Sequence, residues 1–137
     1  MEFEVLDISG DVGLRAYGQS REEVFANAGR GLYHLITDIS AVEEKQDLDV
    51  EAEADSPEGL LVNYLNELIF HFDTYGFIGR RIEIRELSET AIKAKVYGEE
   101  FDIERHERRL LIKAATYHNI EVARINGRWE IAVIFDI

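Results

Sequence analysis

The last residues of the 137-residue chain carry its most distinctive candidate chemistry. The α-carboxylate of Ile137 follows directly on the side-chain carboxylate of Asp136. Two anions this close repel each other unless a cation or hydrogen-bond donors compensate them. Asp11, in a glycine-containing turn near the start of the chain, offers a third carboxylate. Hard divalent cations such as calcium prefer oxygen ligands of this kind, although a solvated strand end accounts for the same residues without any metal.

Lys113 is a second candidate for chemistry. It lies in an alternating stretch, residues 110–117, among Leu111, Ala115 and Tyr117. We therefore expect it to lie within a strand, where partial burial would make the pKa and the partners of a lysine functional. A lysine at a sheet edge whose charged end reaches solvent is the simpler interpretation.

The polar segment 99–109 holds four further residues of types that bind metals. They are Asp102, Glu104, His106 and Glu107. A solvated, charged loop is the simpler interpretation of this segment.

Conventional signals of catalysis are missing from the sequence. It contains no glycine-rich phosphate loop, no G-x-S-x-G motif and no cysteine, and its four histidines lack the paired spacing of metal ligands. A metal-dependent hydrolase built on Asp11 and Asp136 would lack a base and a nucleophile. We therefore predict that the protein is not an enzyme.

The charge balance argues against direct, stable binding of nucleic acid. The chain has 28 acidic and 15 basic residues and a net charge of −13, whereas sequence-independent binding requires neutralisation of phosphates. A local basic patch of Arg105, Arg108, Arg109 and Lys113 remains possible, but we expect RNA to be reached through a partner protein. The absence of cysteine, of a leader peptide and of an apolar run of ~20 residues predicts a soluble, cytoplasmic protein without membrane contact.

Two helices are expected to position these residues. Ser20 and Glu23 form a capping box that opens a helix over residues 21–37. Ser56 and Pro57 open a second helix over residues 57–75, which Gly76 ends.

The rest of the pattern is typical of β-structure in a single domain, residues 1–137. Strands are expected over 3–7, 12–17, 48–54, 81–87, 90–97, 110–117, 120–125 and 129–137. Asn126-Gly127 predicts a hairpin between the last two. The expected fold class is α+β, with two helices packed on one face of a mainly antiparallel sheet.

Five segments in the same order closely resemble the archease family, along nearly the whole chain. The segments are Asp11-Val12-Gly13 with Ala16-Tyr17-Gly18, Asn63 to Leu68, Val96 to Asp102, Ile112 to His118, and Val133 to Ile137.

The resemblance implies a function that the residues alone do not decide. It implies a non-catalytic activator of an RtcB-type tRNA-splicing RNA ligase, which promotes formation of the ligase's histidine–GMP intermediate and repeated turnover. It also implies a divalent metal ion, with calcium favoured, bound by Asp11, Asp136 and Ile137, and a partner-activating role for Lys113. The alternative role for this family is that of a chaperone or specificity modulator of an RNA-modifying enzyme such as a tRNA cytosine methyltransferase.

The chain departs from the family pattern in one turn. Where the family usually has Asp-His-Thr-Ala-Asp, this sequence has Asp7-Ile8-Ser9-Gly10-Asp11. The aspartate at the ligand position is kept, and we expect weaker metal affinity or activation if the family's histidine shapes the turn.

Overall fold

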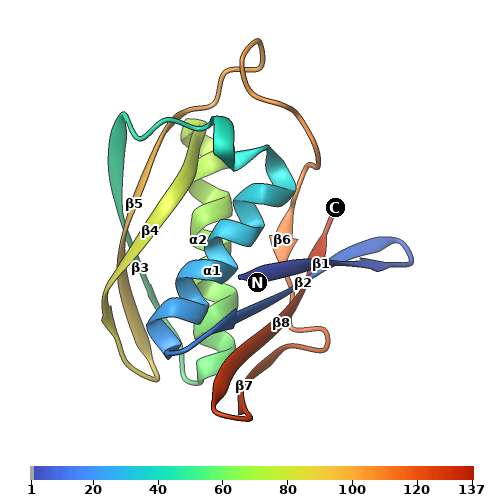
Figure 1. Cartoon of the computed structure of the whole chain (residues 1–137), viewed down its shortest axis with the longest axis vertical. Helices are drawn as coiled ribbons and strands as arrows, with labels where there is room; N and C mark the ends of the chain where they lie inside the picture. The colour runs from blue at the N-terminus through green and yellow to red at the C-terminus, as the bar shows by residue number, and fades with distance from the viewer. Residues whose placement is uncertain (1) are drawn as a thin grey trace.

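Both helices lie between two antiparallel sheets (Figure 1). The computed structural model describes residues 2–137. The larger sheet has the order β1-β2-β8, and β6 and β7 both pair with the free edge of β8. Its strands are β1 (Phe3–Ile8), β2 (Asp11–Gly18), β6 (Ala114–Ala115), β7 (Glu121–Ile125) and β8 (Arg128–Asp136). The smaller sheet has the order β3-β5-β4, formed by β3 (Gln46–Glu53), β4 (Phe77–Leu87) and β5 (Ala91–Glu100).

The first helix, α1 (Arg21–Ile36), begins at the predicted capping box. The Ser20 hydroxyl accepts from the backbone N–H of Glu23 at 3.1 Å, and the Glu23 carboxylate accepts from the N–H of Gln19 at 3.2 Å. The first bond satisfies one of the amide groups that a helix start leaves without partners, and the second ties the Glu23 carboxylate to the residue before the N-cap Ser20. A short 3₁₀ helix, η1 (Ile39–Ala41), follows α1.

The second helix, α2 (Pro57–Tyr75), has the predicted bounds. The Ser56 hydroxyl accepts from the N–H of Gly59 at 3.0 Å, and Gly76 ends the helix with a left-handed φ of 70°. The helices approach closely at Gly29, where a β-carbon would lie 2.6 Å from the hydroxyl oxygen of Tyr64. That hydroxyl donates to the carbonyl of Phe25 at 3.0 Å, so glycine at position 29 makes room for a buried bond between the helices.

The predicted α+β class with two helices and antiparallel strands is confirmed. The strands form two sheets instead of one, and each sheet covers the helix pair from one side (Figure 1). Within the described residues, neither helix is long and apolar enough to cross a membrane.

The predicted strand over residues 110–117 is wrong except at β6. The backbone N–H groups of Arg109 and Leu110 donate to the carbonyls of Ile36 and Leu35, at 3.1 and 3.2 Å. These carbonyls are among those that the end of α1 leaves without helical partners. The alternating residues before β6 therefore cap a helix end, and only Ala114 and Ala115 join the sheet.

Candidate functional site

Three neighbouring strands bring the predicted site residues to one corner of the larger sheet. The last pair between β2 and β8 is Val12 with Phe135, so Asp11 and Asp136 each lie one residue beyond it. Adjacent strands lie about 4.8 Å apart. On the other side of β8, Ala114 of β6 pairs with Asp136. We call the group Asp11, Lys113, Asp136 and Ile137 the β2–β8–β6 corner.

Lys113 joins this corner through its backbone. Its N–H donates to the carbonyl of Asp136 at 2.8 Å, immediately before β6 begins. Its side chain is exposed, as the edge interpretation predicts, whereas the expected position within a strand is wrong. The preceding residues bond to α1 and leave the sheet, so Lys113 directly precedes the two-residue strand β6.

The charges of the corner lack partners within the protein. Across residues 2–137, neither the Asp11 and Asp136 carboxylates nor the Lys113 ammonium forms a side-chain hydrogen bond or an ion pair with another residue. Asp136 is exposed and Asp11 is half-buried. Neighbouring carboxylates without compensating donors favour the approach of a cation.

The donor set of the corner suits a hard divalent ion. No three His, Asp or Glu side chains gather into a metal-binding group anywhere in the described part of the chain, residues 2–137. The predicted site instead combines two side-chain carboxylates with the carboxylate assigned to Ile137. All of these donors are oxygen atoms, as calcium prefers, so the residues present fit such an ion. Metal binding by Asp11, Asp136 and Ile137 stays a prediction.

Asn66 of α2 holds β6 in place, a role that the sequence did not reveal. Its side-chain oxygen accepts from the N–H of Ala115 at 2.7 Å, and its side-chain nitrogen donates to the Ala115 carbonyl at 3.3 Å. The amide thus bonds β6 on the side away from β8, as a further strand would. The signal available in the sequence was an asparagine beside the apolar stripe of a predicted helix.

Thr116 fixes the other end of β6. Its hydroxyl and its backbone N–H both donate to the carbonyl of Ile134, at 2.9 and 3.0 Å. Lys113 is therefore the first residue of a short segment, residues 113–116, that β8 and α2 hold from both sides.

A tight hairpin turn positions Asp11. Ile8 pairs with Asp11 across Ser9-Gly10, and Gly10 has a φ of 82°, which favours glycine. The Ile8 side chain occupies the space over Gly13, where a β-carbon would lie 2.9 Å from its terminal methyl group. Ile8, which stands where the family usually has histidine, thus packs against the backbone of β2 and supports the turn.

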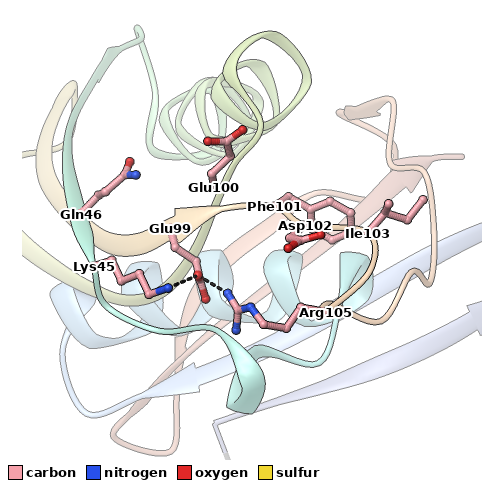
Figure 2. A pocket seen from close by; sticks show the side chains of 8 residues that line it. All are labelled: Lys45, Gln46, Glu99, Glu100, Phe101, Asp102, Ile103 and Arg105. Atoms are coloured by element: carbon pink, nitrogen blue, oxygen red, sulfur yellow. Dashed lines mark hydrogen bonds and ion pairs between the residues drawn. The ribbon is translucent and has the colours of Figure 1, made fainter.

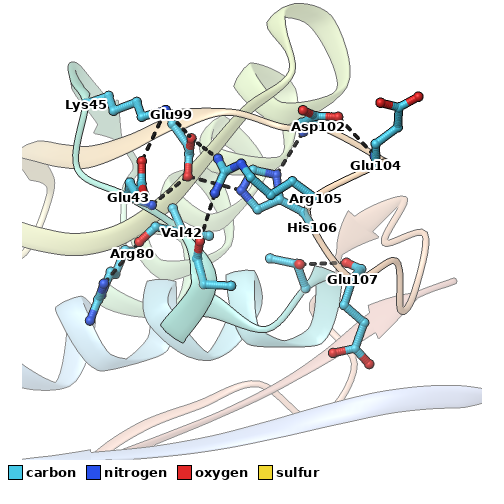
Figure 3. A network of polar contacts seen from close by, with 12 residues as sticks. Val42, Glu43, Lys45, Arg80, Glu99, Asp102, Glu104, Arg105, His106 and Glu107 are labelled. Atoms are coloured by element: carbon cyan, nitrogen blue, oxygen red, sulfur yellow. Dashed lines mark hydrogen bonds and ion pairs between the residues drawn. The ribbon is translucent and has the colours of Figure 1, made fainter.

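A second charged cluster surrounds Glu99 at the end of β5 (Figure 3). The Glu99 side chain is 4% exposed and accepts hydrogen bonds from Arg105, from the N–H of Glu43 at 2.6 Å and from His106 at 3.1 Å. The Lys45 ammonium lies 3.7 Å from it. We call these residues the Glu99 network.

Burial raises the pKa of the Glu99 carboxyl, but its hydrogen bonds outweigh that effect. Those from Arg105, the backbone of Glu43 and His106 together lower the pKa to about 2. Glu99 is consequently ionised at neutral pH, although it is buried.

Both ring nitrogens of His106 are engaged, so it is not free to bind a metal. Nδ1 accepts from the N–H of Asp102 at 2.8 Å, which leaves the proton on Nε2 for donation to Glu99. The imidazole is buried and stacks on Phe101, with ring centroids 5.4 Å apart. The expected solvated loop thus contains one residue that anchors it to the core. Asp102 accepts from the N–H of Glu104 at 3.0 Å.

A cavity of about 590 Å³ opens beside this network (Figure 2). It is lined by Lys45, Gln46, Glu99, Glu100, Phe101, Asp102, Ile103 and Arg105. Figure 2 shows Lys45 and Arg105 turned toward Glu99 from opposite sides. An anionic ligand would have to compete with a buried carboxylate for both cations, so the network is better suited to holding residues 99–107 in place than to binding.

The chain matches one protein family along nearly its whole length. Residues 3–137 match the model of the Archease protein family (MTH1598/TM1083). The chain is similar to the archease of Pyrococcus abyssi, with 37% identity and 98% of each chain covered. It is similar to the archease of Sulfolobus acidocaldarius at 32% identity, again with 98% of each chain covered.

Solved structures show the same fold. The solution structure of Methanobacterium thermoautotrophicum protein 1598 superimposes with a TM-score of 0.80 at 35% identity, with 98% of each chain covered. A Thermotoga maritima crystal structure described as an archease and possible chaperone has a TM-score of 0.66 and covers 98% of this chain and 96% of its own. At 20% identity, that second likeness concerns the fold alone. The family model and the similar sequences establish that this chain belongs to the archease family.

Proposed function

We propose that this protein is a non-catalytic activator of an RtcB-type RNA ligase and acts through the β2–β8–β6 corner. The observation that carries the proposal is the meeting of Asp11, Asp136 and Lys113 at three adjacent strand ends, with no compensating partner in residues 2–137. Membership of the archease family supports an accessory role beside an enzyme partner. The ligase is the partner that the resemblance in sequence implies.

A divalent ion, calcium in this proposal, would be held by Asp11, Asp136 and the carboxylate of Ile137. Such an ion supplies positive charge beside a phosphate group. Transfer of a nucleotide phosphate spreads negative charge over its oxygens, and correctly placed cations stabilise that charge.

Lys113 would place a further positive charge beside the same phosphate group. Its ammonium is exposed and unpaired within residues 2–137, so it is available to donate hydrogen bonds to phosphate oxygens. Its backbone is fixed by Asp136, and β6 is fixed by Asn66. Because the backbone at Lys113 is already held, only the side chain loses conformational freedom when it reaches the partner's nucleotide site.

A guanylylation time course tests the proposal. An RtcB-type ligase is mixed with GTP and a divalent cation, alone or with the wild type, Lys113→Ala or the control Lys95→Ala. Lys95 belongs to the smaller sheet, 3.5 Å from both Asp47 and Asp49. We expect the wild type and Lys95→Ala to accelerate formation of the ligase–GMP adduct. Lys113→Ala should give at least tenfold less acceleration, and its melting temperature should equal that of the wild type.

A ligase that is guanylylated and turns over at the same rate with and without the wild type would contradict the proposal. The alternative is a chaperone or specificity modulator for an RNA-modifying enzyme. The description of the Thermotoga maritima protein as a possible chaperone favours testing it. Protection of a tRNA cytosine methyltransferase from aggregation, with no effect on the ligase, would support that alternative.

A further inference from the structure

An apolar groove lies where the segment after β5 passes the end of α1. It encloses about 320 Å³ and is lined by Ile36, Phe72, Phe101, Ile103, Arg108, Arg109, Leu110 and Leu111. Ile103 is 61% exposed and Leu111 is 65% exposed. Large apolar side chains gathered around a concave surface are typical of sites that bind another protein or a small molecule.

The charge of this groove is opposite to that of the chain. Two arginines and no acidic residue line it, although the chain has 28 acidic and 15 basic residues. Arg109 is already paired, since it lies 3.1 Å from the Glu107 carboxylate and donates to the His34 carbonyl at 2.9 Å. Arg108 pairs with no carboxylate among residues 2–137, so it can receive one from another molecule.

The groove is preformed. Arg109 and Leu110 are tied by their backbones to the end of α1, and the hydroxyl of Thr37 donates to the Glu107 carbonyl at 2.6 Å. Phe101 packs edge-on against Phe72, with ring centroids 5.4 Å apart. Groups that are already fixed lose little conformational entropy when a ligand binds.

The groove also neighbours the β2–β8–β6 corner. Leu111 lies two residues before Lys113, a span of at most ~7 Å along the chain. In Figure 1 the segment that leaves this loop runs down to β6, and the C-terminus lies beside β6. A protein that covers the corner would therefore reach the groove.

We infer that this groove binds a segment of a partner protein that presents a large apolar side chain flanked by aspartate or glutamate. The apolar side chain enters between Phe72, Phe101 and Leu111, and a flanking carboxylate pairs with Arg108. Naming the ligase as that partner rests on the proposed function, whereas the chemistry of the segment follows from the groove itself. A nucleic acid backbone would satisfy Arg108 but would leave the apolar lining uncovered.

A peptide titration followed by ¹H–¹⁵N NMR tests the groove without the ligase. The probes are an acidic hexapeptide, Asp-Glu-Leu-Phe-Glu-Asp, and a basic counterpart in which lysines flank the same Leu-Phe pair. We expect the acidic peptide to shift resonances of residues 101–111 and to bind at least tenfold more tightly than the basic one. Arg108→Glu should reverse this preference, and Leu111→Asp should weaken the binding of both peptides.

Tyr75→Asp is the matched control, because Tyr75 is 66% exposed and does not line the groove. It should bind like the wild type. Equal binding of both peptides to the wild type, or shifts that map elsewhere, would overturn the inference. The inference would also be overturned if a uridine oligonucleotide shifted the resonances of the same residues as strongly as the acidic peptide. Self-association of the wild type that Leu111→Asp abolishes would overturn it too.

Binding and activation measurements with the ligase distinguish this inference from the proposed function. Arg108→Glu and Leu111→Asp should each weaken binding to the ligase at least fivefold, while Tyr75→Asp should not. Groove binding of the acidic peptide together with no binding of the ligase by the wild type would support the groove and contradict the ligase as partner. Activation of the ligase that both groove variants retain in full would overturn the groove as its docking site.

Discussion

The two charged clusters of this protein use the same kinds of residue but differ in how their charges are matched. In the Glu99 network, one buried carboxylate receives hydrogen bonds from an arginine, a histidine and a backbone amide. At the β2–β8–β6 corner, two carboxylates and a lysine come together at strand ends with no such bonds among residues 2–137.

This difference separates a structural cluster from a candidate site. A buried charge whose hydrogen bonds are complete anchors the chain around it, because loss of any partner leaves an unpaired group behind. An exposed group of unmatched charges contributes little to folding, so its arrangement is better explained by a ligand or a partner.

The largest expected effect is on stability, from removal of the Glu99 carboxylate. Glu99→Ala leaves Arg105, His106 and the Glu43 amide without their acceptor, and loss of one member of a buried pair costs about 3 kcal/mol. Urea unfolding at pH 7 measures the change. A loss below about 1 kcal/mol would mean that the network is not the anchor of residues 99–107.

The pH dependence of stability should identify the same carboxylate. The pKa of Glu99 is lowered from 4.5 to about 2 in the folded protein. Its contribution is therefore complete above pH 4.5 and is lost as the pH falls from 4.5 toward 2. Urea unfolding of the wild type and Glu99→Gln across pH 2–7 isolates the contribution of the Glu99 charge to the free energy of unfolding. The difference between the two proteins should shrink through that window, and a constant difference would show that the charge of Glu99 does not matter.

Asn66→Ala should have an intermediate effect on stability and should test how the β2–β8–β6 corner is held in place. It removes two hydrogen bonds to Ala115 and should cost about 1–2 kcal/mol. It should also reduce ligase activation, because Lys113 would lose the support of β6. Asn63→Ala is the control, since Asn63 is exposed and bonds only to the Glu53 carbonyl among the described residues. Equal activation by both variants would show that Lys113 needs no such support.

Asp11→Asn should have the smallest effect on folding. Without calcium, the free energy of unfolding should stay within about 0.5 kcal/mol of the wild type, because the carboxylate has no partner among residues 2–137. Thermal melts with and without calcium measure this. A loss above 2 kcal/mol without calcium would place Asp11 among the structural residues.

Local signals in the sequence predicted the helices, whereas the strand arrangement depends on pairing between segments far apart in the chain. The bounds of α2 follow from Ser56, Pro57 and Gly76, all of which act within one turn of the helix ends. The strand predicted over residues 110–117 failed because its first amides bond to α1, about 75 residues earlier in the chain. The division into two sheets also depends on strand partners that no local pattern specifies.

The candidate site shows the same division. The sequence pointed to Asp11, Asp136, Ile137 and Lys113, and the strand register places the backbones of Asp11, Lys113 and Asp136 beside one another. Asn66 was missed because its role depends on which strand meets α2. His106 was misjudged because its polar neighbours in sequence concealed a buried imidazole.

A calcium titration by isothermal calorimetry tests the central claim most directly. The proteins are the wild type, Asp136→Asn at the corner and Asp102→Asn near the Glu99 network, where Asp102 is exposed. We expect the wild type and Asp102→Asn to bind one calcium ion with equal affinity, and Asp136→Asn to bind it at least tenfold more weakly. Undiminished binding by Asp136→Asn would contradict the assignment of the metal site to the β2–β8–β6 corner.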